Sequence, residues 1–180
     1  MVTLVKLLFS RPVSFSSFLP MVNPNTVVRR QFTTHSSLVS LFLPRTAWSQ
    51  WLPNKVNDFS DITISAGDLI RLTVIALSRT FGKARIDNLT NGEKSERFLS
   101  SDIPLCGQNA EWIVEDYTVG TAYAPFANFS TVTFENAMAG GSGGIFNGSD
   151  GTLFNIAQNG SVLTSTSASG WSVTIEYYRA

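Results

Sequence analysis

Histidine and cysteine are nearly absent from this sequence, which has one of each among its 180 residues. His35 lies within the first 45 residues, so the rest of the chain has no histidine for a Ser-His-Asp or Cys-His catalytic device. Structural zinc sites are built from clusters of cysteine and histidine. We therefore expect no metal and no cofactor, and any chemistry must come from carboxylates, amides and hydroxyls.

An excess of charge and a long apolar run are also missing. The 13 basic and 13 acidic residues give a net charge of zero, and no basic stripe favours nucleic acid. No apolar run reaches the roughly 18 residues of a transmembrane helix. The hydrophobic fraction of 43% is enough for one folded domain with a core. We therefore predict a monomer that binds neither nucleic acid nor a membrane.

Acidic residues are absent before Asp58, which sets the start of the chain apart. Residues 1–45 are basic and rich in serine and phenylalanine. Three interpretations compete: an organelle transit peptide, a signal peptide with a short and interrupted apolar core, and a wrongly joined or truncated start of the coding sequence. We favour the third. We expect residues 1–45 to be an atypical leader, with at least part of residues 1–30 poorly ordered, and residues 46–180 to form the domain. The strand-like residues 37–43 could pair with this domain.

From residue 46 onward the pattern is that of a β protein. Short runs of β-branched and aromatic residues are separated by turns that contain glycine and asparagine, with a hairpin signal at Asn91-Gly92. No amphipathic helix is visible. The glycine-rich residues 140–144 indicate a flexible hairpin loop, because the lysine and helix that follow a phosphate-binding loop are absent. The spacing predicts an antiparallel sandwich or barrel. The expected strands are residues 59–65, 69–77, 84–90, 111–117, 125–137, 152–158, 161–167 and 171–178.

Three carboxylates, Glu111, Glu115 and Asp116, lie in the expected strand AEWIVEDY at residues 110–117. Alternation places Glu111 and Glu115 on one face, about 13 Å apart at 3.3 Å per residue. That distance is too long for a carboxylate pair that shares a proton or for the pair of a glycosidase. If one of these carboxylates is catalytic, its partner must come from another strand. The simpler interpretation, which is the commoner one for strand carboxylates, is a solvated face or pairing with lysine or arginine.

AEWIVEDY resembles the hallmark of the fungal glutamic peptidases, the eqolisins. Further motifs occur in family order, so that the resemblance covers roughly residues 46–180. It implies a β-sandwich of the lectin-like jelly-roll type, incomplete on its N-terminal side, and a secreted endopeptidase that acts on proteins or peptides at acid pH. The supporting motifs are AWSQWLP (47–53), FSDITISAGDLI (59–70), ARIDNLTNGEK (84–94), LCGQNAEWIVEDY (105–117), PFANFSTVTFENA (125–137) and QNGSVLTSTSASG (158–170).

The resemblance maps the family's catalytic glutamate onto Glu115, as the general base that activates a water. The family's catalytic glutamine, which stabilises the oxyanion, has no counterpart in residues 1–45, where the surroundings of Gln31 do not match. Gln50 stands where relatives usually have a glutamate near the substrate cleft, so Gln50 and Trp48 are candidate substrate-binding residues. Gln50 can equally be a polar residue between packed tryptophans, and Trp48, Trp51 and Trp112 can line a cleft or pack a core.

Cys106 is the only cysteine, so it has no intramolecular disulfide partner. In relatives the corresponding cysteine pairs with an upstream cysteine, whereas the simpler interpretation is a small buried residue. Four N-x-S/T sequons, at Asn88, Asn128, Asn147 and Asn159, give modest support for secretion.

Two classes of function remain. One is a glutamic endopeptidase with Glu115 as its base, whose activity in this chain is in question because the catalytic glutamine is absent. The alternative is a noncatalytic jelly-roll relative that binds peptide or carbohydrate, because sandwiches of this kind host many functions.

Overall fold

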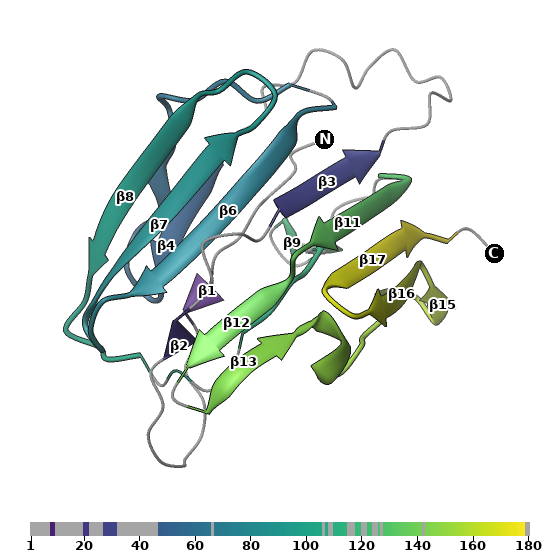
Figure 1. Ribbon diagram of the computed structural model, residues 1–180. Coiled ribbons are helices and arrows are strands. Elements are labelled where there is room, and N and C mark those ends of the chain that lie inside the picture. The colour runs from purple at the N-terminus through teal and green to yellow at the C-terminus, as the bar shows by residue number, and fades with distance from the viewer. Residues whose placement is uncertain are drawn as a thin grey trace.

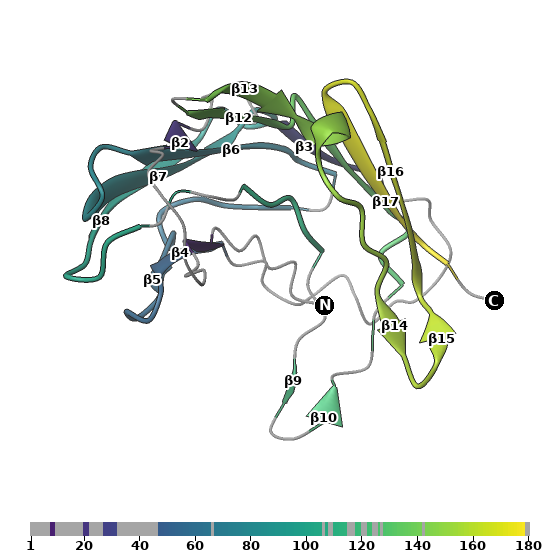
Figure 2. The ribbon, with the colours of Figure 1, turned by 90° about the horizontal axis from the view of Figure 1, so that it is seen from below.

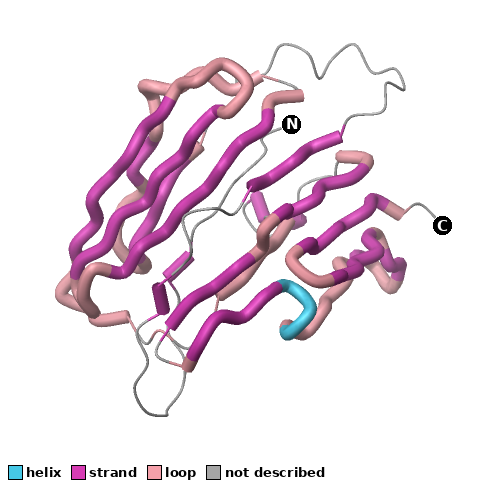
Figure 3. The backbone as a smooth tube through the Cα atoms, in the orientation of Figure 1, coloured by secondary structure: helices cyan, strands magenta, loops and turns pink. Residues whose placement is uncertain are grey.

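The computed structural model describes residues 8–9, 20–21, 27–31, 47–65, 67–105, 107, 110–114, 118–119, 122–123, 126, 128–141 and 143–178. Strands dominate this part of the chain, and helical structure in it is limited to the 3-10 turn η2, Gly148–Asp150 (Figure 3). All strand pairs are antiparallel except one, so the all-β antiparallel fold predicted from the sequence is confirmed. Among the described residues, no helix has the length and apolar character needed to cross a membrane.

One large sheet organises the molecule. Its ten strands run in the order β13-β12-β2-β6-β3-β11-β17-β16, with β7 and β8 added beyond β6 (Figure 1). The strands are β2 (Pro20–Met21), β3 (Val27–Gln31), β6 (Leu69–Ala76), β7 (Phe81–Asn88), β8 (Lys94–Ser100), β11 (Thr131–Glu135), β12 (Met138–Gly141), β13 (Gly144–Asn147), β16 (Thr164–Ser169) and β17 (Ser172–Tyr177).

Smaller strand groups lie away from this sheet. A three-stranded group joins β1 (Leu8–Phe9), β4 (Trp48–Trp51) and β5 (Asn57–Asp58), and Figure 2 shows β4 and β5 on one side of the large sheet. Within this group β1 pairs with β4 in parallel. Two short hairpins, β9 (Thr118–Val119) with β10 (Ala122–Tyr123) and β14 (Ala157–Gln158) with β15 (Ser161–Val162), extend from the sheet on that same side.

The strands β6, β7 and β8 follow the period-two pattern of a sheet with one face on a core. Ile70, Leu72, Ala84, Ile86 and Leu99 share the inner face by register and are buried. They pack with residues of the β4–β5 layer and of the following loop. We call this cluster the β6–β8 core: Ala47, Trp51, Phe59, Ile62, Ile70, Leu72, Ala84, Ile86, Leu99 and Leu105.

A second apolar cluster lies under the other end of the large sheet. It is formed by β11, β17 and the residues that precede β11, and Trp112, Val114 and Phe126 pack against it from outside the strands. We call it the β11–β17 core: Phe129, Val132, Phe134, Ala137, Val173 and Ile175. Among the residues whose burial is described, the apolar core is therefore divided between two clusters along one sheet.

The strand β3 joins these two regions, because it lies between β6 and β11 (Figure 1). It is antiparallel to both, with Val27 to Arg29 opposite Arg71 to Leu69 and Val27 to Gln31 opposite Glu135 to Thr131. β1, β2 and β3 all come from the segment that the sequence assigns to the leader. The strand-like residues 37–43 lie outside the described residues, as does Cys106.

Several expectations about individual elements are wrong. Residues 59–65 alternate as a strand does but form a turn and a loop, in which Phe59 and Ile62 reach the β6–β8 core. The hairpin expected at the glycine-rich residues 140–144 is confirmed, since they connect β12 to β13, with Gly140 opposite Ile145 and Gly141 opposite Gly144. Residues 111–114 and 152–156 were expected in strands but lie outside the assigned ones, and β8 is a strand that was not predicted from the sequence.

Candidate active site

The predicted catalytic residue Glu115 lies outside the described residues, and the segment that leads to it is described up to Val114. Along this segment Glu111 and Ile113 are exposed, whereas Trp112 and Val114 are partly buried and pack against the β11–β17 core. The alternation expected for AEWIVEDY is thus present as far as residue 114. The position of the Glu115 carboxylate remains a prediction.

The candidate substrate-binding residues lie on β4, where burial alternates. Ser49 and Trp51 are buried, and Trp48 and Gln50 are partly exposed on the opposite face. Residues three apart in a strand point to opposite faces, so Trp48 and Trp51 cannot line one surface. Trp51 belongs to the β6–β8 core, and its indole nitrogen donates to the carbonyl oxygen of Ile103 at 3.0 Å. Trp48 is left as the β4 tryptophan that can contact a ligand.

The side chain of Gln50 has a local partner. Its Nε2 donates to the carbonyl oxygen of Asn54 at 2.7 Å, and Nδ2 of Asn54 donates to the carbonyl oxygen of Ser100 at 3.0 Å. The backbone N–H of Asn54 also donates to the carbonyl oxygen of Trp51 at 2.7 Å. These bonds close the turn after β4 and attach it to the end of β8. Gln50 therefore has a structural role in this turn, and one of its two amide hydrogens is already used.

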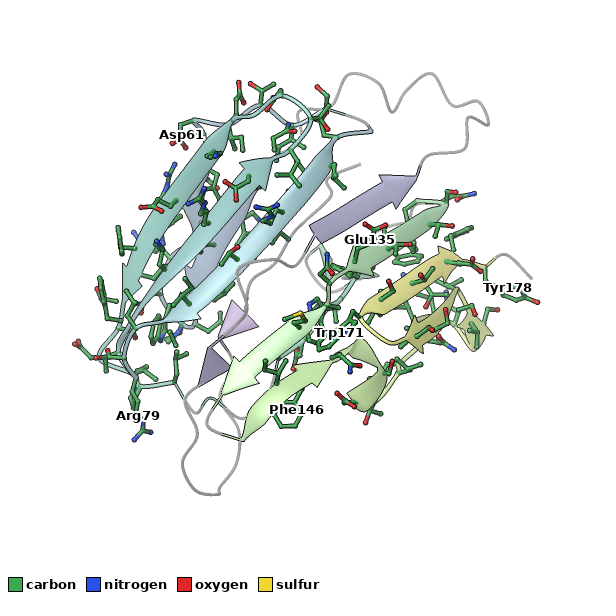
Figure 4. The ribbon with its side chains drawn as sticks, in the orientation of Figure 1. Asp61, Arg79, Glu135, Phe146, Trp171 and Tyr178 are labelled. Carbon is green, nitrogen blue, oxygen red and sulfur yellow. The ribbon has the colours of Figure 1, made fainter. Side chains whose placement is uncertain are left out.

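A carboxylate with a perturbed pKa lies beside β8 rather than in AEWIVEDY. Arg97 bonds the Asp61 carboxylate with both terminal nitrogens, and the Ser95 hydroxyl donates to it at 2.8 and 2.9 Å. These hydrogen bonds lower the pKa of Asp61 from 3.8 to about 2, and the bond from Arg97 has the largest effect. The Arg97 guanidinium also lies 5.0 Å from the centre of the Phe59 ring. Figure 4 places Asp61 at the loop beside β8. The arrangement fastens the 58–61 loop over the core.

A second ion pair lies on β7, on the face of the β7–β8 hairpin opposite to that of Arg97. Arg85 binds Asp87 through Nε at 3.0 and 3.2 Å and through a terminal nitrogen at 2.8 Å. The carboxylate of Asp87 is buried, and the pair raises the pKa of Arg85. Neither ionic contact was predicted from the sequence. The i, i+2 spacing of Arg85 and Asp87 in a strand was the signal available for the second pair.

Comparisons with known proteins assign the chain to a family. Residues 44–177 match the Peptidase A4 family. Aspergillopepsin-2 from Aspergillus niger is 49% identical over 133 residues, which are 73% of this chain and 47% of that protein. Scytalidopepsin B from Scytalidium lignicola is 36% identical over 140 residues, 73% of this chain and 54% of that protein. The chain thus spans about half the length of the curated relatives that it matches.

Solved structures agree with this assignment. The crystal structure of aspergilloglutamic peptidase from Aspergillus niger superposes with a TM-score of 0.67 at 48% identity, covering 73% of this chain and 78% of that one. Scytalido-glutamic peptidase with a transition-state analogue inhibitor superposes with a TM-score of 0.63 at 26% identity, covering 89% and 88%. The resemblance indicated by the motifs is confirmed, and the chain belongs to the peptidase A4 family, the glutamic peptidases or eqolisins.

Proposed function

We propose that this protein is an endopeptidase that hydrolyses peptide bonds of protein or peptide substrates at acid pH, with Glu115 as its general base. The observation that carries the proposal is the family match over residues 44–177, which contains the AE-x-x-x-E pattern ending at Glu115. We further propose that the protein acts outside the cell.

In this mechanism the Glu115 carboxylate takes a proton from a water molecule, and the water oxygen attacks the carbonyl carbon of the scissile bond. A proton then passes to the leaving amine as the carbon–nitrogen bond breaks. A general base of this kind typically contributes 10²–10⁴-fold to the rate. To remain ionised in acid, the carboxylate needs hydrogen-bond donors that lower its pKa.

The tetrahedral intermediate also needs a donor for its oxyanion, and a side-chain amide suits this role because its protonation does not change with acidity. We do not assign the role to Gln50, because it does not stand at the position of the family glutamine and its Nε2 bond to Asn54 O ties the side chain to the turn after β4. Gln31 is the last residue of β3, and its sequence context differs from that of the family glutamine. Trp48 and Gln50 are proposed as substrate contacts, which their position on the partly exposed face of β4 supports.

The test is an assay of protein cleavage at acid pH with the purified chain and two matched variants. Glu115→Gln removes the proposed base, and we expect the rate to fall by at least about 10²-fold. Glu111→Gln removes an exposed carboxylate from the same segment, and we expect it to retain activity.

Equal activity in the wild type and Glu115→Gln would remove Glu115 from the mechanism. An inactive wild type that binds peptide or carbohydrate would instead favour the noncatalytic alternative. Binding can be measured by calorimetry with a peptide and an oligosaccharide at the same pH.

A further inference from the structure

We propose that Asn159 is an acceptor for an N-linked oligosaccharide and that Asn88, although it also lies in a sequon, is excluded from this modification in the folded protein. The inference rests on the proposed passage of the protein through the secretory route. The N-x-S/T triplet is necessary for this modification but marks a site only where the surface presents it. The structure distinguishes the four triplets by burial and hydrogen bonding.

The Asn88 triplet is part of the interior. Asn88 has only 1% of its surface exposed, and its Nδ2 donates to Thr63 O at 3.0 Å and to the Asp68 carboxylate at 2.7 Å. Its Oδ1 accepts from the amides of Thr90 and Asn91 at 3.0 and 3.3 Å. Both hydrogens of the nitrogen that would carry the sugar are therefore engaged. A glycan added before folding would prevent this packing, so folded protein should lack it.

The Asn128 and Asn147 triplets are at the surface but are built into packed turns. Asn128 is exposed, yet the next residue, Phe129, is buried in the β11–β17 core. Asn147 caps η2 through its Oδ1, with the Ser149 amide as donor at 2.8 Å. Gly148 is buried, and the Ser149 hydroxyl donates to Gly170 O at 2.9 Å. Packing and hydrogen bonds therefore hold both triplets in the conformation of their turns.

The Asn159 triplet differs from the other three because all of its residues are exposed. Asn159, Gly160 and Ser161 form the turn and the start of β15, and none is buried. Asn159 and Gly160 have φ angles of 49° and 78°, the left-handed values that asparagine and glycine tolerate in a two-residue hairpin turn. Figure 2 shows the β14–β15 hairpin extending away from the large sheet. Loop tips of this kind accept bulky additions without disturbing a core.

The modification is a group transfer from a lipid pyrophosphate-linked oligosaccharide, the donor used by the transferase of the secretory route. Nδ2 of Asn159 forms a bond to the anomeric carbon of the first sugar as the bond from that carbon to the pyrophosphate oxygen breaks. The lipid pyrophosphate leaves, and the amide nitrogen loses one proton. No oxidant or reductant takes part.

The experiment expresses the full chain in a eukaryotic secretion host behind an added signal sequence. Export then does not depend on residues 1–45, so a failure of the proposed localisation cannot be mistaken for a failure of this inference. Site occupancy is measured by mass spectrometry of the secreted protein, through the conversion of glycosylated asparagine to aspartate by a peptide-N-glycosidase. Ser161→Ala destroys the Asn159 triplet at an exposed position, and Ser161→Thr preserves it.

We expect Asn159 to have the highest occupancy of the four sites, and Asn88 to be unmodified. Ser161→Ala should lose one glycan and be secreted as a folded protein, whereas Ser161→Thr should keep the glycan. An unmodified Asn159, a higher occupancy at Asn128 or Asn147, or a glycan on Asn88 in secreted protein would each overturn the inference.

Discussion

At Gly148 the lack of a side chain is a packing requirement. The residue is buried at the start of η2, and a Cβ placed there would overlap Cγ2 of Val173 and lie 3.7 Å from the Cβ of Ala137. Val173 and Ala137 both belong to the β11–β17 core, which leaves little room for adjustment. We expect Gly148→Ala to lower the free energy of unfolding by about 1–3 kcal/mol, the usual range for overpacking. Urea unfolding followed by tryptophan fluorescence measures this change.

The matched control is Gly143→Ala at the β12–β13 turn. Gly143 is exposed, and a Cβ there would make ordinary contacts with Phe146 at 3.6 and 3.9 Å. Its free energy of unfolding should stay within about 0.5 kcal/mol of the wild type, as is usual for surface substitutions. Equal effects of the two substitutions would mean that η2 does not pack on Val173 as described.

Asp61 gives the molecule an ionic contact that survives in acid. Its pKa is lowered from 3.8 to about 2 by the hydrogen bonds of Arg97 and Ser95. A carboxylate with a lowered folded-state pKa stabilises the fold above its unfolded pKa, and this contribution is lost as the pH falls through the folded pKa. Asp61→Asn should therefore be less stable than the wild type above about pH 4, and the difference should shrink as the pH falls towards about 2.

The measurement for Asp61 is urea unfolding across that pH range. Asp58→Asn serves as the control, because Arg97 uses the carbonyl oxygen of Asp58 at 3.0 Å and the substitution leaves that acceptor in place. We expect Asp58→Asn to follow the wild-type pH profile. A stability difference for Asp61→Asn that is constant from neutral pH to about pH 2 would contradict the role of the ion pair.

Among the elements, the hairpin of β7 and β8 depends on one buried amide. Besides bonding Thr63 O and the Asp68 carboxylate, Asn88 accepts from two amides of the turn that follows it. Asn88→Ala would leave several buried or turn groups without partners, at about 1–3 kcal/mol for each buried group left unsatisfied. We expect a total loss of about 2–4 kcal/mol in the free energy of unfolding.

Thermal unfolding of protein made in a bacterial host, where no glycan is added, tests this expectation. Asn91→Ala is the matched control, since Asn91 is exposed in the same turn and its Oδ1 accepts from the Glu93 amide at 2.9 Å. Asn91→Ala should lower the free energy of unfolding by less than Asn88→Ala does. The reverse order would show that the turn, and not the buried network, holds the hairpin.

The same elements show what a sequence can predict. Residues 69–77 were correctly expected as a strand, since a long β-branched apolar run suits the middle of a sheet. Residues 59–65 alternate equally well but form a loop, whose backbone amides are satisfied by side chains: the Glu93 carboxylate bonds Thr63 N, and the Asp68 carboxylate bonds Ser65 N. The bond between Glu93 and Thr63 joins residues 30 apart in the chain, so it leaves no local trace in the sequence.

The candidate site was predictable to a similar extent. The motif identified the family and named Glu115. The strand β4 was not among the expected strands, so the opposite faces of Trp48 and Trp51 were not predicted. The bond from Gln50 to Asn54 O depends on the turn after β4, which the sequence does not specify. The pairing of β3 with β6 and β11 likewise brings together residues far apart in the chain.

At the scale of the whole molecule, the division of the described buried residues between two cores has a thermodynamic consequence. The β6–β8 core and the β11–β17 core lie along one sheet, and within that sheet β2 and β3 form the connection between them. β2 is paired with β6 at a single position, Met21 opposite Ile75, so β3 is the main connection. Two clusters joined by one short strand are expected to unfold in separate steps, because cooperativity needs shared contacts.

Calorimetry of the full chain should therefore give an unfolding enthalpy larger than the van't Hoff enthalpy of the same transition. Tryptophan residues report the two regions separately, Trp51 from the β6–β8 core and Trp112 from its contact with the β11–β17 core. Variants that keep only one of these tryptophans should have different unfolding midpoints.

A disulfide between β3 and β11 tests whether β3 couples the two cores. Arg29 and Thr133 are opposite each other, and paired residues of antiparallel strands have Cα atoms about 4.5–5.5 Å apart, which a disulfide can span. Arg29→Cys with Thr133→Cys, in a Cys106→Ser background, should cross-link within one chain and couple the unfolding of the two cores. The two transitions should then approach each other, and reduction should separate them again. A single two-state transition in the reduced protein, with equal enthalpies and coincident tryptophan midpoints, would mean that the sheet already unfolds as one unit.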